Sequence, residues 1–210
     1  MRRDPRSVLQ ESFPYWYLLP GNWALVRLDD EGDVQAWAAE LHRSLPEIPE
    51  RRLADDVRDL LSAIERIPIL ETHVYARDVD DGYALAVQTV TIVPFTREPD
   101  TQPEDALLDL SRRLDESADF PQPASSLLAD GERLILRQER VMTSAPGLPW
   151  SESREVRYLV EHPSGSVAAV LNFMTPNVSS PALVTVFDAI AGTFRWMPSD
   201  QALTATRPGL

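Results

Sequence analysis

The segment Ser166–Met174 (SVAAVLNFM) constrains the fold of this chain more than any other part of its sequence. It is almost wholly apolar at both odd and even positions, and a β-strand turns successive side chains to opposite faces of its sheet. A strand with this pattern has both faces covered, which places it in the middle of a sheet. We therefore expect helices to pack on both sides of that sheet.

Short turns between the predicted strands favour an antiparallel sheet. The predicted hairpins are Arg154–His162 with Ser166–Met174, and Ile69–Arg77 with Tyr83–Val93. Pro163-Ser164-Gly165 separates the first pair, and Asp81-Gly82, which suits a type I′ turn, closes the second. Strands joined this way run antiparallel, so the fold class expected is α+β, an antiparallel sheet with helices on both faces.

Helical periodicity places helices between these strands. They are predicted to begin near Asp33, Leu53, Thr101 and Ser180. The second has the clearest period, because its apolar residues recur at steps of four and three up to Ile67. Ser180 is the expected N-cap of the last helix, with Pro181 in its first position.

The remaining elements and the boundaries are less sharply marked. We predict further strands at Asn22–Leu28 and Glu132–Met142, and a loop over Phe120–Asp130. The 210 residues, 43% of them hydrophobic, suffice for one domain over residues 13–197. Residues 1–12 and 198–210 are predicted to be flexible ends.

The charge balance and the missing residue types restrict the function. All 20 basic residues are arginine, against 33 acidic residues, giving a net charge of −13. Nucleic acid is therefore an unfavourable partner, whereas a basic protein would be attracted. The absence of lysine excludes Schiff-base chemistry, and the absence of cysteine excludes thiolate chemistry. Arginine without lysine is also typical of a high-GC genome, which suggests a bacterial source.

Spacing gives no cofactor or metal motif. The eight glycines are never closer than eleven residues apart, and the three histidines are at least 31 apart. Neither pattern fits a phosphate-binding loop or a local metal site, so we expect no cofactor and no metal. The N-terminus has no apolar segment of a secretory signal, and no run approaches the roughly 20 residues that span a bilayer. A cytoplasmic location without membrane insertion is predicted.

The most interesting polar set lies on one predicted strand. Glu71, His73, Tyr75 and Arg77 alternate, so they project from one face, and an Asp81-Gly82 turn would place Gln88 across from Tyr75. A carboxylate beside an imidazole can orient a general base, and an arginine can hold an anion. However, Glu71 and His73 are about 6.5–7 Å apart at Cα, with no nucleophile nearby. An ordinary solvated face is the alternative.

Two further features are candidates for binding. Glu132–Met142 and Arg154–His162 carry Arg137 and Arg157 among mixed charges, which would form either an arginine-rich binding surface or solvated cross-strand pairs. Trp150 stands alone in a Pro- and Gly-containing loop. It is either an exposed anchor for a partner or a lid on the core.

The C-terminal part of the chain resembles a known fold group. The succession VRYLVEHP, LNFMTP and FDAIAGTFRW resembles the closing strand, strand and helix of Mog1/PsbP-like proteins, which include bacterial DcrB-like and secretion-chaperone relatives. The matching residues lie in Val156–Trp196, and the pattern extends from about Phe13. The resemblance implies an antiparallel sheet between helices. It also implies a binding or accessory role, because these proteins share no catalytic motif.

Two functions from different classes follow. The first is a non-catalytic, protein-binding accessory module of the chaperone, adaptor or immunity type. The second is a small-molecule-binding protein or enzyme that uses the strand face around His73.

Overall fold

The computed structural model describes residues 12–26, 31–44, 46, 48–62, 69–79, 82–115, 121–130, 133–143 and 150–198. Most of both predicted flexible ends lies outside the described residues. The helices are α2 (Glu31–Ser44), α3 (Glu50–Ser62), α4 (Pro103–Asp115) and α5 (Pro181–Thr193). In the described part of the chain, no helix is both long enough and apolar enough to cross a membrane.

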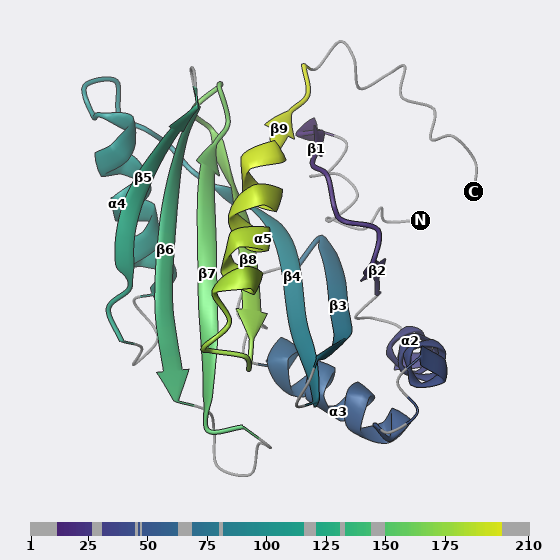
Figure 1. Ribbon diagram of the computed structural model, residues 1–210. Coiled ribbons are helices and arrows are strands. Elements are labelled where there is room, and N and C mark those ends of the chain that lie inside the picture. The colour runs from purple at the N-terminus through teal and green to yellow at the C-terminus, as the bar shows by residue number, and fades with distance from the viewer. Residues whose placement is uncertain are drawn as a thin grey trace.

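The strands form one large and one small sheet. They are β1 (Tyr15–Trp16), β2 (Trp23–Leu25), β3 (Glu71–Val79), β4 (Gly82–Pro94), β5 (Ala124–Asp130), β6 (Arg133–Thr143), β7 (Glu152–Glu161), β8 (Val167–Thr175) and β9 (Arg195–Trp196). Seven of them form an antiparallel sheet in the order β2-β3-β4-β8-β7-β6-β5, and β1 pairs with β9 separately (Figure 1). The α+β class with an antiparallel sheet is confirmed.

The apolar strand that the sequence places at the centre is β8. It is fourth of the seven strands, paired with β4 and β7, and all nine of its residues are buried. Its even-numbered residues face α3 and α4, whereas its odd-numbered residues face α5, so helices cover both faces. We call these the α3/α4 face and the α5 face (Figure 1). The predicted two-sided covering is confirmed.

Separate apolar clusters hold the helices to the sheet. On the α3/α4 face, Leu53 and Val57 of α3 pack in one cluster, and Leu107 of α4 in another. On the α5 face, the Phe187 ring of α5 stacks on Phe173 of β8, with ring centroids 4.7 Å apart. The N-terminal segment adds its own apolar residues to this last cluster.

The predicted N-cap is correct for α5 and wrong for α2. Ser180 caps α5 as predicted, because its side chain accepts a hydrogen bond from the Leu183 amide and Pro181 follows it. Asp33, the predicted N-cap of the first helix, instead lies inside α2, which begins at Glu31. Of the predicted strand Asn22–Leu28, Trp23–Leu25 form β2, and residues 27 and 28 lie outside the described residues.

The largest correction concerns Phe120–Asp130, for which a loop is predicted. Residues 124–130 form β5, which pairs with β6 from Ala124↔Glu139 to Asp130↔Arg133. Alanine and serine have weak strand preferences, so the local signal was poor. The segment becomes a strand because it pairs with β6, which is already part of the sheet.

The hairpin of β3 and β4 forms as predicted, but in a different register. It closes at Val79↔Gly82, one residue earlier than an Asp81-Gly82 turn requires. Gln88 therefore lies opposite His73 and not opposite Tyr75. A shift of this kind keeps the same side chains on the same face, because each partner moves by two residues.

Candidate functional site

The first half of the predicted face on β3 is covered. Glu71, His73 and Gln88 lie on the α5 face, where the extended segment after β1 crosses them. The Tyr17 hydroxyl donates to Glu71 Oε2 at 2.9 Å and lies 3.2 Å from His73 Nδ1. His73 Nδ1 is in turn 3.0 Å from Gln88 Oε1. The structure thus brings together Glu71, His73 and Gln88 of the predicted set, with a tyrosine that was not predicted.

Burial makes this cluster different from a solvated sheet face. Gln88 is fully buried and His73 nearly so. Burial lowers the pKa of His73 below its ordinary value, although the Glu71 carboxylate and the Gln88 hydrogen bond act in the opposite direction. For Tyr17, by contrast, burial and the Glu71 charge both raise the pKa of the hydroxyl. Tyr17 therefore covers the Nδ1 side of His73.

The other half of the predicted face lies apart from this cluster. Tyr75 is half-buried and packs beside Trp23, with ring centroids 5.4 Å apart. Arg77 is exposed towards the end of β3. The structure thus separates the predicted set into a covered polar cluster and an open end.

The buried His73 gives a pH dependence with a definite sign. A histidine whose pKa is lowered in the folded state binds its proton less readily there than in the unfolded chain. Its unfavourable contribution therefore appears as the pH falls through the unfolded value, about 6.5. We expect His73→Gln to gain stability relative to wild type between pH 8 and pH 5.5, as followed by urea unfolding at each pH. A difference in unfolding free energy between His73→Gln and wild type that stays constant from pH 8 to pH 5.5 would contradict this.

A second polar group crosses the other face of the sheet. One residue from each of six adjacent strands lies in a single row on the α3/α4 face. From β3 to β5 this row, which we call the polar belt, consists of Thr72, Thr89, Asn172, Arg157, Gln138 and Ser125. All but Ser125 are buried. The belt runs between the apolar clusters beneath α3 and α4.

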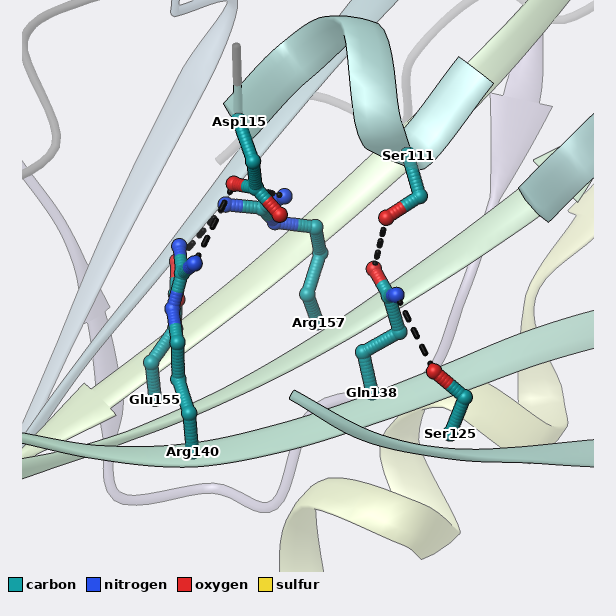
Figure 2. Close-up of polar contacts among 7 residues, drawn as sticks. All are labelled: Ser111, Asp115, Ser125, Gln138, Arg140, Glu155 and Arg157. Carbon is teal, nitrogen blue, oxygen red and sulfur yellow. Dashed lines mark hydrogen bonds and ion pairs between the residues drawn. The ribbon is translucent and has the colours of Figure 1, made fainter. Parts of the chain in front are cut away.

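Four charged side chains form an arginine–carboxylate cluster around Arg157, the fourth residue of the belt (Figure 2). Arg157 contributes Nη1 to Asp115 Oδ1 at 3.0 Å and Nη2 to Glu155 Oε1 at 3.1 Å. Arg140 contacts the same two carboxylates, through Nε to Glu155 and through Nη1 to Asp115 at 3.2 Å. Each arginine thus bridges both acids. The cluster is neutral in formal charge.

The cluster is shielded from water. The side chains of Arg140, Glu155 and Arg157 are each less than a tenth exposed, and Asp115 is about a fifth exposed. Burial alone would lower the pKa of Arg157, but the charges of Glu155 and Asp115 more than offset this and raise it. The space that these residues enclose leaves no volume for a water molecule. Arg157 therefore stays charged, and both arginines are paired with carboxylates.

The arginine–carboxylate cluster is better suited to a structural role than to a catalytic one. Asp115 is the last residue of α4, where the two guanidinium groups also favour the negative end of the helix dipole. One turn earlier, Ser111 Oγ donates to Gln138 Oε1 at 2.6 Å, and Gln138 Nε2 donates to Ser125 Oγ at 3.2 Å (Figure 2). The polar contacts thus tie α4 to β6, β7 and the edge strand β5.

The predicted arginine-rich surface does not form, because its residues lie on opposite faces. Arg137 pairs in register with Tyr158, so Arg137 lies on the α5 face, whereas Arg157 lies on the α3/α4 face. Arg137 is half-buried and bonds to Asp188 and Glu139, each at 2.7 Å. Arg157 is buried, so neither a shared surface nor a solvated pair describes it. Arg137 and Arg157 cannot serve one binding surface together.

Of the two positions predicted for Trp150, the structure shows the lid on the core. It is half-buried and packs against the apolar cluster under α3. A ring held in this way acts as a lid on the core, which leaves less of it for a partner to contact.

The edges of the large sheet differ from each other. The edge at β2 is three residues long. The edge at β5 is seven residues long, and residues 124–128 are exposed. Leu127 and Leu128 are 45% and 39% exposed and lie on opposite faces of the strand. Among the described strands, β5 pairs with β6 alone, so its outer backbone edge is open.

Tyr17, Asp115, Arg140 and the β5 edge were not predicted from the sequence. Alternation along Arg133–Thr143 would have put Arg140 on the face opposite Arg137. The other three depend on which segments meet in space. Among the described residues, no group of three or more histidine and acidic side chains is arranged to hold a metal ion.

Comparisons with known proteins identify no family for this chain. No family model matches the chain, and no curated protein matches it. Among solved structures, LpqN of Mycobacterium tuberculosis, described as involved in cell envelope biogenesis, is similar at 14% identity. The match covers 89% of this chain and 85% of that chain, with a TM-score of 0.49. It does not confirm the Mog1/PsbP-like resemblance, which stays a prediction.

Proposed function

We propose that this protein is a non-catalytic binding module that takes up an extended segment of a partner protein along the open edge of β5. The exposed edge of that strand is the observation that carries the proposal. A row of unpaired backbone N–H and C=O groups is a template for another strand. Strand addition of this kind is a common mode of peptide recognition.

Most of the β5 edge lacks the usual side-chain protection against pairing, because its one charged residue is the terminal Asp130. Soluble proteins block an edge with charges, proline, shortness or a cover. Residues Ala124–Ala129 carry no charge and no proline, and two exposed leucines present apolar surface on both faces. Pro121 and Pro123 precede the strand, so pairing would begin after them. An added strand would cover both leucines.

The polar contacts beneath β5 support the same role. The chain of hydrogen bonds from Ser111 through Gln138 to Ser125 holds this strand against α4 and β6. A strand held in place binds an incoming segment at a lower cost in conformational entropy. The arginine–carboxylate cluster has no net formal charge, which is consistent with a structural role in supporting the sheet next to this edge. Tyr17 covers the Nδ1 side of His73, which favours a binding role over a catalytic one.

Charge indicates the kind of partner. The net charge of −13 attracts basic proteins and speeds their encounter. We infer a partner segment that alternates apolar residues with arginine or lysine. Chaperones, adaptors and immunity-type proteins, the classes favoured by the sequence, act through surfaces of this kind.

Lysine substitutions on the edge test the proposal. Random peptides displayed on phage are selected on the full chain, and the enriched ones are measured by fluorescence anisotropy. We expect enriched peptides to be basic and extended, and the Leu127→Lys/Leu128→Lys double variant to weaken their binding at least about tenfold, or 1.4 kcal/mol. Both leucines are partly exposed, so the variant should remain folded.

The matched control is Leu25→Lys on the opposite edge, where the side chain is 60% exposed. It should bind the peptides as wild type does. Peptides that bind both variants equally, or no enrichment over an unrelated acidic protein, would contradict the proposal. A concentration-dependent dimer in sedimentation, lost in the β5 variant, would make a second copy the occupant and overturn the choice of a basic partner.

A further inference from the structure

We propose that a groove between the end of the β3–β4 hairpin and α5 binds a small ligand with one carboxylate on an apolar body. The groove has a volume of about 430 Å³. This lies within the range of small-molecule sites. It is on the α5 face, away from the β5 edge, so the inference is independent of the proposed function.

Small residues opposite large ones create the groove. In the hairpin register, Ala86 lies opposite Tyr75 and Ala84 lies opposite Arg77. Ala84, the one of the two that lines the groove, cannot fill the space beside the longer Arg77 side chain. The Tyr75 ring is fixed from the other side by Trp23. The hollow is therefore part of the fold and does not require a rearrangement to open.

The lining combines apolar walls with a single cation. Leu183 and Val186 of α5 and Val79 of β3 supply aliphatic surface, and the ring of Tyr75 adds aromatic surface. Arg77 supplies the positive charge. The other arginines that line or cross the sheet make ion pairs or bond to backbone oxygens, whereas Arg77 makes neither with any described residue.

This chemistry selects the ligand class. A guanidinium binds a carboxylate through two parallel hydrogen bonds. Its charge complements an anion, while the apolar walls favour a hydrocarbon body over a free inorganic ion. Because the whole chain is strongly negative, the charge of Arg77 alone would not retain a small anion. We infer that both parts of the ligand are needed, as in a medium-chain aliphatic carboxylic acid.

Octanoate is a suitable probe. Titration into the uniformly ¹⁵N-labelled full chain should give saturable chemical-shift changes at the end of β3 and the start of α5. Octanol lacks the charge and acetate lacks the body, so each should bind at least about tenfold more weakly. Arg77→Gln should reduce octanoate affinity by a similar factor. Ala182→Trp, which fills the groove from an exposed position on α5, should abolish binding.

The matched control is Arg113→Gln, which removes an exposed arginine from α4 on the opposite face of the sheet. It should leave octanoate affinity unchanged. Shifts scattered over the surface, equal affinity in Arg77→Gln and Arg113→Gln, or octanol binding as well as octanoate would overturn the inference. Spectra of each variant establish that the fold is retained.

Discussion

Replacing Glu155 with alanine is expected to lower the free energy of unfolding by about 3–5 kcal/mol. Glu155 contacts both buried arginines of the arginine–carboxylate cluster. Without it, Arg140 and Arg157 would share Asp115 alone, and both arginine side chains are less than a tenth exposed. An uncompensated buried charge is costly because the lost interaction is not replaced by solvent. Urea denaturation followed by tryptophan fluorescence measures the change.

An exposed pair supplies the control for this experiment. Asp109 is 68% exposed on α4 and pairs with Arg112. Asp109→Ala should change the unfolding free energy by no more than about 0.5 kcal/mol, because solvent screens such pairs. A loss for Glu155→Ala as small as that of the control would mean that the cluster does not brace the sheet. An unchanged denaturant slope in both variants would show that the change lies in stability.

The second large effect is expected on the α5 face. Phe187→Ala should lower the unfolding free energy by about 3–5 kcal/mol, since it removes a fully buried ring from the centre of an apolar cluster. The lost ring stacks on Phe173 of the central strand. The variant therefore measures how strongly α5 holds that face of β8. Thermal unfolding by circular dichroism and urea denaturation should agree.

Thr185 on the exposed side of the same helix is the matched control. Its hydroxyl donates to the Pro181 carbonyl within the helix. Thr185→Ala should stay within about 0.5 kcal/mol of wild type. A similar loss in both variants would mean that packing on the sheet is not the source of the effect, because alanine has the higher helix propensity in both substitutions.

The parts of the fold that sequence predicts are those fixed by neighbouring residues. The apolar run of β8 required cover on both faces whatever its neighbours were. Ser180 and Pro181 define the start of α5 through contacts within a single turn. The hairpin of β3 and β4 depends on two strands and one short connection, so only its register was wrong.

The arginine–carboxylate cluster depends on contacts that no local pattern encodes. Arg140 meets Glu155 because β6 lies beside β7 in one particular register, although eight residues separate the two strands in the chain. Asp115 arrives from α4, 25 residues before Arg140 in the chain. The same reason explains β5, whose residues become a strand by pairing with β6. Long-range placement, and not residue type, separated Arg137 from Arg157.

Hydrogen exchange at β5 tests the central claim most directly, namely that a partner segment adds to this edge. Amides of β5 that are not bonded to β6 should exchange rapidly in the free protein and become protected when a selected basic peptide is bound. Amides of β2, on the other edge, should exchange at the same rate in both states. Protection confined to β2, the α5 groove or any other surface, with β5 unchanged at saturating peptide, would contradict the account.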